Sequence, residues 1–411
     1  MYSLKMKDLI RDFFKGITPN YVDHSNVIVL NQKCIRNNQI DFSLARFHDS
    51  KKTYPSKKEL QVGDILINST GAGTAGRCAF IRELPKNYSV VADSHILVVR
   101  ISDFFIAGCV QYGLFNIEKL LQTFLDGSTG QGEFDKQRLL NVIIPIPNNP
   151  KYIYQFLSNL DKKIVLNKQI NARLEEMAKT LYDYWFVQFD FPDASGKPYK
   201  SSGGDMVFDE TLKREIPKGW EVKSLGEIEN NIITGKTPST QYSNFFNGDI
   251  PFITIGDIRN NTFIIKTEQN LSIEGANNQK NKYLPEGSLC VSCIATVGLI
   301  GFTTRQAQTN QQINSIIFKH DYNKEFLYFY LKDYFLVGKA KTGNTFANMN
   351  KGDFEKILVL YPNLKLLQKY SNKMVLVFNQ INNLSKQNHQ LTQLRDFLLP
   401  MLMNGQVSVA K

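Results

Sequence analysis

Residues 71–76 of this chain, Gly-Ala-Gly-Thr-Ala-Gly, have the spacing of a G-x-G-x-x-G loop. Such a loop binds a dinucleotide or S-adenosylmethionine when a helix follows at once, because the N-terminal amides of that helix face the ligand. Here residues 77–81 have a strand pattern and Pro85 follows soon after. The counterpart at residues 294–298 lacks most of the glycines. We therefore expect a strand-to-strand loop whose glycines let the backbone approach a partner closely.

Three other motifs could carry chemistry, and none is complete. Cys290 and Cys293 have C-x-x-C spacing, but no second pair supplies the other ligands of a zinc site. Asp193 followed by residues 221–223 resembles a nuclease pattern too short to be specific. Residues 148–152 are similar to the N-P-P-Y loop of amino-methyltransferases but lack its second proline. We expect no catalytic residues, no metal site and no cofactor in this chain.

Two long amphipathic stretches organise the chain. In both, apolar residues recur every 3.5 positions, which is typical of a coiled coil. Leu157 and Met374 are 217 positions apart, and this offset holds along both stretches, so the second keeps the heptad register of the first. The paired seam positions are Leu157, Leu160, Ile164, Asn171, Leu174 and Leu181 in the first stretch and Met374, Val377, Ile381, Asn388, Leu391 and Leu398 in the second.

The repeat extends through the segments that precede each stretch. Residues 16–19 recur as 235–238, and residues 95–99 correspond to 312–316. The common order of these pairs predicts a duplicated domain, with insertions in loops. The expected organisation is a first domain at 1–150, a long helix at 151–188, a Pro/Gly/Ser-rich linker at 189–215, a second domain at 216–362 and a second long helix at 363–411.

Composition agrees with a folded, basic protein. The 411 residues are 42% hydrophobic, which supports packed cores rather than disorder. The net charge of +11 suits a polyanionic partner. Five scattered cysteines and the lack of an apolar stretch of membrane-spanning length favour a cytoplasmic protein without membrane contact.

The predicted fold class is α+β: two β-rich mixed domains joined by two long helices that form an antiparallel coiled coil with pseudo-two-fold symmetry. A helix of about 35 residues is roughly 50 Å long. That length brackets the ~34 Å between DNA half-sites one turn apart. Two differing domains would then recognise two differing half-sites with an unread gap between them.

The chain resembles, along nearly its whole length, the specificity subunit of type I restriction-modification systems. The resemblance rests on residues 29–35, 63–71, 181–192, 216–221 with 225–226, and 235–238. It implies two target recognition domains that read a bipartite asymmetric sequence in double-stranded DNA, and helices that set the gap. It also implies two methyltransferase subunits that use S-adenosylmethionine, and two motor-nuclease subunits that use ATP and Mg²⁺.

Asn171 and Asn388 occupy equivalent a positions, where a polar side chain fixes register. In an antiparallel pair each can meet a polar group such as Arg395 or Asn167, or bond to water or to a docked methyltransferase helix.

The candidate DNA-binding residues are polar or glycine positions in loops, and ordinary solvated turn positions remain an equal alternative for each. They are Asn68, Ser69, Thr70, Gly71, Gly73, Arg77, Ser128, Thr129 and Gln131 in the first domain and Lys236, Thr237, Ser239, Ser292, Thr296, Asn344, Thr345 and Asn348 in the second.

Two other functions stay open. A single-chain DNA methyltransferase or nuclease could use the same recognition architecture, but it would need a complete cofactor loop. A coiled-coil scaffold whose domains bind protein would show no DNA binding in a gel shift.

Overall fold

The structure is a computed structural model that describes residues 2–71, 73–126, 132–342 and 348–409. The chain divides into two compact units. Unit 1 comprises residues 1–163 and 391–411, and unit 2 comprises residues 164–390. Both mix helix and sheet, as the sequence predicted. In the part of the chain that is described, no helix is long and apolar enough to span a membrane.

Unit 1 contains two four-stranded sheets and a short terminal ribbon. The ribbon pairs the first strand, β1 (Tyr2–Lys5), antiparallel with the last, β14 (Ile143–Ile146). The first sheet has the order β2 (Asp12–Lys15), β11 (Ile96–Arg100), β8 (Ile65–Asn68) and β9 (Cys78–Phe80). The second has the order β10 (Ser89–Ala92), β4 (Val27–Leu30), β7 (Arg46–His48) and β3 (Tyr21–Val22). Short paired strands are β5 (Ile35–Arg36) with β6 (Gln39–Ile40) and β12 (Leu125–Asp126) with β13 (Glu133–Phe134).

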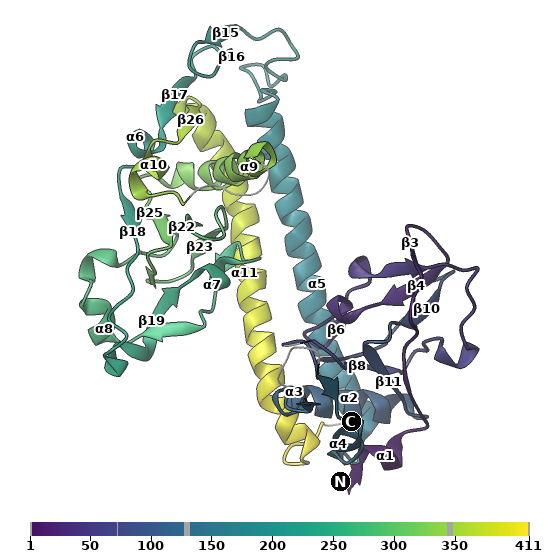
Figure 1. The fold of residues 1–411 in the computed structure, drawn as a ribbon. Coiled ribbons are helices and arrows are strands. Elements are labelled where there is room, and N and C mark those ends of the chain that lie inside the picture. The colour runs from purple at the N-terminus through teal and green to yellow at the C-terminus, as the bar shows by residue number, and fades with distance from the viewer. Residues whose placement is uncertain (1, 72, 127–131, 343–347, 410–411) are drawn as a thin grey trace. The chain divides into compact units, whose positions relative to one another are not determined.

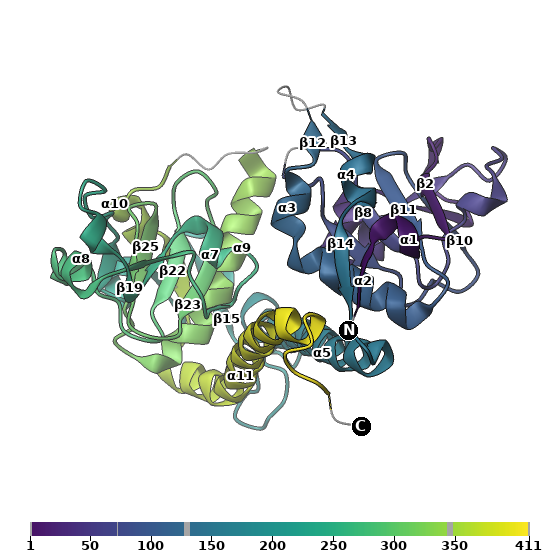
Figure 2. The ribbon, with the colours of Figure 1, turned by 90° about the horizontal axis from the view of Figure 1, so that it is seen from below.

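The core of unit 1 lies under one buried helix, α2 (Phe104–Asn116), which packs against β9 and β14 (Figure 2). The apolar pattern of the sequence predicts one helix in each domain, around residues 117–125 and 326–337. In unit 1, α3 (Glu118–Gln122) lies at the first of these places. The longer α2 was missed because it is apolar on every side and has no amphipathic period. The remaining short helices are α1 (Met6–Leu9) and α4 (Lys136–Leu140).

Unit 2 repeats this plan. Its β17 (Glu221–Ser224) pairs antiparallel with β26 (Leu358–Tyr361), as β1 pairs with β14. A five-stranded sheet has the order β18 (Ile232–Thr234), β25 (Ile313–Ile316), β22 (Leu289–Ser292), β23 (Ile300–Thr303) and β20 (Phe263–Ile264). A second sheet has the order β21 (Gln269–Leu271), β19 (Phe246–Ile253) and β24 (Gln308–Thr309).

Helices and a hairpin complete unit 2. The hairpin joins β15 (Met206–Asp209) to β16 (Arg214–Pro217). The helices are α6 (Leu225–Ile228), α7 (Ile255–Ile258), α8 (Ile273–Asn277), α9 (Lys324–Thr342) and α10 (Lys351–Glu355). The helix predicted around residues 326–337 is α9, and its apolar face enters the largest core of the unit.

Two long helices carry the heptad stretches. They are α5 (Pro150–Tyr182), continued by a π-helical turn at Asp183–Val187, and α11 (Leu364–Met403). Every predicted seam residue is buried or half-buried, which agrees with the 3.5-residue pattern.

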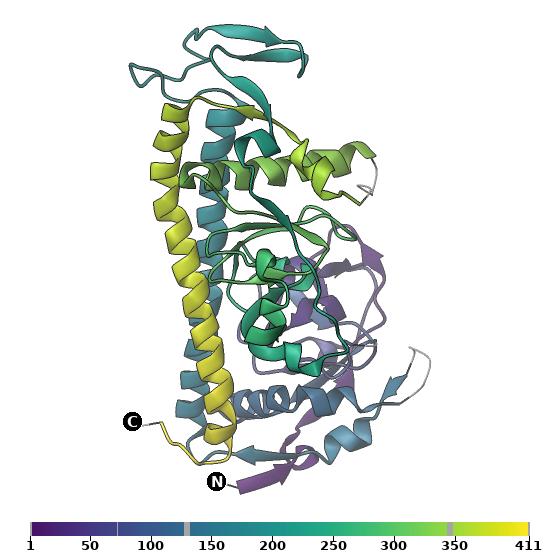
Figure 3. The same ribbon diagram turned by 90° about the vertical axis from the view of Figure 1, so that its left-hand side faces the viewer.

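Within unit 2 the two helices lie side by side (Figures 1 and 3) and contact each other through polar seam residues. Asn167 Nδ2 donates to Asn388 Oδ1 at 2.9 Å, so the prediction that Asn388 meets Asn167 is confirmed. Asn171 Nδ2 donates to Ser385 Oγ at 3.1 Å. Residue numbers rise on α5 as they fall on α11, so these segments run in opposite directions. Arg395 does not meet the asparagines; it pairs with Asp161 in unit 1.

Candidate nucleic-acid interface

The glycine loop of unit 1 joins β8 to β9, so a strand follows it, as the sequence predicted. Gly71, Gly73 and Gly76 all have positive φ, at 89°, 75° and 82°. A Cβ on Gly76 would lie 2.8 Å from the backbone of Leu121 and Gln122 in and beside α3. The last glycine therefore serves the packing of the loop on the domain helices, and the first two give the loop its turn.

Four side chains, those of Gln32, Asn68, Ser69 and Thr74, hold this loop. Gln32 Nε2 donates to Thr70 O at 2.7 Å, and Asn68 Nδ2 donates to Gln32 O at 3.2 Å. Ser69 Oγ donates to His95 O at 2.9 Å. Thr74 Oγ1 donates to Thr70 O at 3.0 Å. Because its backbone is tied at so many points, the loop has a defined shape on which exposed groups can be presented.

The counterpart in unit 2 reaches a similar end with fewer glycines. Ser292 Oγ donates to Thr296 O at 2.5 Å and accepts from Leu299 N at 2.8 Å. Ala295 takes a positive φ of 62°, and its N–H donates to Asn348 Oδ1 at 3.4 Å. The loop is thus closed by a serine where unit 1 uses glycine conformations.

The G-x-T-P loops at residues 16–19 and 235–238 lie against the turns at residues 92–96 and 309–313. Gly235 N donates to Ile313 O at 3.1 Å, and a Cβ on this glycine would lie 2.2 Å from Asn310 O. On Gly16 the same atom would lie 2.1 Å from Asp93 O. Both glycines are therefore required by a close approach of backbone to backbone.

The structure places the predicted DNA-contact residues in three classes of exposure. Gly73, Lys236, Ser239 and Asn348 are exposed, and Thr70, Gly71, Arg77, Thr237 and Thr296 are half-buried. Asn68, Ser69 and Ser292 are at most 1% exposed, so their side chains support the loops from inside. Ser128, Thr129, Gln131, Asn344 and Thr345 lie outside the described residues.

One position that the sequence analysis did not select belongs to this surface. His95 is exposed at the end of the β10–β11 turn, and its Nδ1 lies 3.0 Å from Thr70 Oγ1. Gln312 occupies the same place in unit 2, between β24 and β25. The repeat pair 95–99 and 312–316 contained the signal, but its first positions, 95 and 312, were not selected as candidates.

The C-x-x-C pair has the packing role that the sequence favoured. Cys290 lies in β22 and Cys293 directly after it, and both thiols are buried. Burial raises the pKa of Cys290 to about 12 and that of Cys293 to about 11. Among the residues described, no group of three or more histidine, cysteine, aspartate or glutamate side chains is placed to hold a metal ion.

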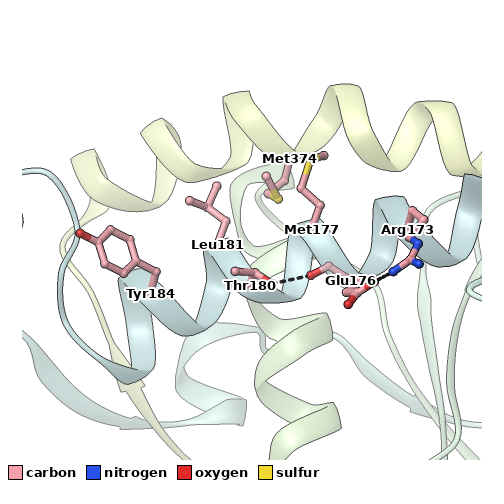
Figure 4. Close-up of a pocket in the computed structure, with 7 residues that line it drawn as sticks. All are labelled: Arg173, Glu176, Met177, Thr180, Leu181, Tyr184 and Met374. Carbon is pink, nitrogen blue, oxygen red and sulfur yellow. Dashed lines mark hydrogen bonds and ion pairs between the residues drawn. The ribbon is translucent and has the colours of Figure 1, made fainter.

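A second surface lies along the helices of unit 2. A groove of about 570 Å³ is bordered on α5 by Arg173, Glu176, Met177, Thr180 and Leu181, on the π-helical turn by Tyr184 and on α11 by Met374 (Figure 4). Met177 is 53% exposed, and Leu166 and Ile170 continue the exposed apolar line along α5. These positions are four and seven residues apart, so they lie on one face of α5 and form an apolar stripe in addition to the seam that faces α11.

Comparison with known proteins gives one consistent family. The family model of the type I restriction modification DNA specificity domain matches residues 14–176 and again residues 217–393. The specificity subunit of the type I restriction enzyme HindI of Haemophilus influenzae is 32% identical, over 93% of this chain and 95% of that protein. The MjaIX specificity subunit of Methanocaldococcus jannaschii is 28% identical, over 72% of this chain and 68% of that protein.

A solved structure supports the fold. The crystal structure of the type I restriction-modification system S subunit from M. genitalium has a TM-score of 0.56. The alignment covers 98% of this chain and 95% of that one, at 15% sequence identity.

Proposed function

Because this chain belongs to the family of type I restriction-modification DNA specificity proteins, we propose that it recognises the target sequence of such a complex and catalyses no step itself. The observation that carries the proposal is the duplicated loop frame. Equivalent backbone hydrogen bonds hold the G-x-T-P loop in both units, Gly16 N to Ile96 O at 3.0 Å and Gly235 N to Ile313 O at 3.1 Å. Around this shared frame the exposed side chains differ.

The target is bipartite and asymmetric. Two copies of one frame with different exposed side chains fit two different half-sites, each read by one copy. The exposed or half-buried residues Arg77, Lys236, Thr237 and Asn348 supply contacts, with the cations directed to phosphates or guanine edges. The net charge of +11 favours association with the duplex.

The helices form an antiparallel coiled coil that sets the length of the unread gap. Helix α5 has 33 residues and α11 has 40. At 1.5 Å per residue these correspond to roughly 50 and 60 Å, longer than the ~34 Å of one duplex turn. The seam contact between Asn167 and Asn388 fixes the register of the pair, since a shift by one heptad would separate the two amides.

The apolar groove on α5 and α11 is the docking surface for a methyltransferase subunit. An apolar stripe such as Leu166, Ile170 and Met177 is suited to packing against a partner helix. The proposed complex contains two methyltransferase subunits with S-adenosylmethionine and two motor-nuclease subunits with ATP and Mg²⁺, and it acts in the cytoplasm.

Sequencing of the methylated bases in host DNA, with and without this gene, tests the proposal directly. We expect one bipartite adenine-methylation motif that disappears with the gene. In vitro, the purified chain transfers no methyl group from S-adenosylmethionine until a methyltransferase subunit is added. Methylation by the pure chain would overturn the proposal and support a single-chain methyltransferase.

Deletion of one heptad from each long helix tests the spacing role. Each deletion shortens a helix by about 10 Å, which corresponds to about three base pairs. The expected motif keeps both half-sites and changes only the length of the gap. An unchanged gap together with altered half-site bases would show that the helices do not set the spacing.

A further inference from the structure

The turn that ends in His95 is held by backbone hydrogen bonds and by the side chain of one aspartate. His95 N donates to Asp93 Oδ1 at 2.9 Å, and Ile96 N donates to Asp93 O at 3.1 Å. Ser69 N donates to His95 O at 2.8 Å, which ties the turn to the glycine loop. The backbone position of residue 95 is therefore fixed, while its side chain stands on the exposed side.

The same turn occurs in unit 2 with different side chains. Gln312 N donates to Asn310 Oδ1 at 3.1 Å, and Ile313 N donates to Asn310 O at 3.3 Å. Cys293 N donates to Gln312 O at 2.8 Å, as Ser69 N does to His95 O. Three hydrogen bonds of one turn are thus reproduced, and the residue at its corner changes from an exposed histidine to a half-buried glutamine.

In each turn a local partner holds one polar atom of the corner side chain. Gln32 donates to Thr70 Oγ1, so the hydroxyl proton of Thr70 is available to His95 Nδ1 at 3.0 Å. A neutral His95 that accepts this proton at Nδ1 carries its own ring proton on Nε2. In Gln312, Oε1 accepts from Asn310 Nδ2 at 3.0 Å, which directs the N–H groups of Nε2 elsewhere.

Both corners therefore offer an N–H donor from a side chain whose other end is fixed. Within the described part of the chain, neither His95 Nε2 nor Gln312 Nε2 has a recorded hydrogen-bond partner. A fixed donor on a rigid turn is the chemistry that recognises an acceptor on the edge of a base, such as N7 or O6 of a purine in the major groove. A solvated turn residue has no need of a fixed orientation.

We propose that His95 and Gln312 are equivalent specificity-determining positions, each donating an Nε2 hydrogen to a purine acceptor in one half-site. The inference rests on the proposed function and adds the residues that discriminate bases. Because Gln312 Oε1 is occupied by Asn310, its contact is a single hydrogen bond rather than the two-point contact that glutamine makes with adenine.

The test uses the complete complex with its methyltransferase subunits. In His95→Ala, discrimination at one purine of one half-site should fall by about 5- to 150-fold, while the other half-site is unchanged. Gln312→Ala should do the same to the other half-site alone. His24→Ala and Gln269→Ala, at exposed positions of units 1 and 2, are the matched controls and should change neither half-site.

A substituted duplex sharpens the test. Replacing the affected purine by its 7-deaza analogue removes an N7 acceptor without changing base pairing. If N7 is the partner, this analogue should weaken binding by the wild-type complex and leave the alanine variant unaffected. If the partner is O6 of a guanine, 2-aminopurine, which lacks that oxygen, should have the same effect. The swap variants His95→Gln and Gln312→His keep an N–H donor at the corner, so they should bind more tightly than the alanine variants.

The outcomes separate this inference from the proposed function. If the wild-type complex has no bipartite motif, the proposed function fails. If the motif exists and both alanine variants, folded by circular dichroism, retain full discrimination or lose both half-sites equally, the corner residues do not read bases and the inference is overturned. If an alanine variant unfolds, the substituted duplexes decide: unchanged binding of the wild-type complex to every duplex that lacks a purine N7 or O6 acceptor overturns the inference.

Discussion

The carboxylate of Asp161 on α5 is the centre of a buried polar cluster in unit 1, and its removal should destabilise that unit. Its oxygens accept from Arg395 Nη1 at 2.9 Å, Arg82 Nη2 at 3.1 Å and Tyr112 Oη at 2.6 Å. A fourth donor is Asn38 Nδ2 at 3.3 Å. Burial and then Asp161 raise the pKa of Tyr112, which keeps its hydroxyl a proton donor.

The size of the effect follows from what Asp161→Ala would leave behind. The side chain of Asp161 is 3% exposed, that of Arg395 9% and that of Arg82 21%. Removing one partner of a buried pair costs about 3–5 kcal/mol. Arg395 keeps a second acceptor in Asp396, at 2.7 Å from Nη2, and Arg82 is partly solvated. We therefore expect the low end, about 3 kcal/mol, or a fall in Tm of roughly 6–12 °C.

Calorimetry measures the change, and fluorescence locates it. Trp185 and Trp220, the two tryptophans of the chain, lie in unit 2, so their emission reports unfolding of that unit. The control is Asp396→Asn, which removes the exposed partner of the same arginine and should cost under about 1 kcal/mol. If Asp161→Ala shifts the calorimetric transition no more than this control, the cluster does not stabilise unit 1.

Four further predictions concern other buried groups. Burial raises the pKa of Glu325 to about 7, so unit 2 should be most stable below the ordinary value near 4.5 and lose up to about 3 kcal/mol as pH rises through 7; urea unfolding at pH 5 and 8 should show this loss, and Glu325→Gln should abolish it. Phe378→Ala should cost about 3–5 kcal/mol in unit 2, measured by tryptophan fluorescence. Asn167→Leu should cost about 1–3 kcal/mol by leaving its partner Asn388 without the amide it now meets, and the double change to leucine should recover most of that loss in thermal melts. The five cysteines are buried with raised thiol pKa values, so a thiol reagent at pH 8 should label them only as fast as the chain unfolds.

The sequence predicted those parts of the fold in which residue types recur at regular spacing. The heptads of α5 and α11 and the repeat that relates the two units are visible as spacing, and the structure has helices in both places. Helix α2 was missed because it is buried on all sides. The contact of Asn388 with Asn167 was expected as one of several, since a polar residue at a seam position needs a partner.

The candidate interface was predicted only as a set of loops. Composition identified the glycine loop, but it could not separate Asn68 and Ser69, which are buried, from Arg77, which is half-buried. That distinction depends on which loops pack against Gln32 and His95, and these come from distant segments. His95 was not selected from the sequence, because the hydrogen bond from its backbone N–H to Asp93 Oδ1, which sets it in a turn, is not a periodic feature.

Equivalent positions of the repeat carry an ion pair in unit 1 and apolar packing in unit 2. At the offset of 217, Asp161 corresponds to Phe378 and Arg395 to Ala178. In unit 1 the position is ionic, with Asp161 bound to Arg395. In unit 2, Phe378 packs edge-on against Phe302 and Tyr328, with ring centroids 6.0 and 5.4 Å apart, and Ala178 is buried.

We therefore expect substitutions at Asp161 in unit 1 and at Phe378 in unit 2 to differ in their effect on stability. Buried apolar area of the right shape stabilises an aromatic cluster whichever apolar side chain supplies it. The cluster in unit 2 should therefore tolerate volume-conserving changes such as Phe378→Leu at a cost under about 1.5 kcal/mol. A buried ion pair needs both partners, so Asp161→Leu should destabilise unit 1 unless Arg395 and Arg82 are changed with it. Placing Asp at position 378 should be as harmful as removing it from 161, because no arginine stands at 178 to meet it. The corresponding experiment gives unit 1 the residues of unit 2, with Asp161→Phe and Arg395→Ala together. We expect this double variant to be more stable than Asp161→Phe alone. Equal stability of the two variants would show that the apolar pair cannot replace the ion pair at this position.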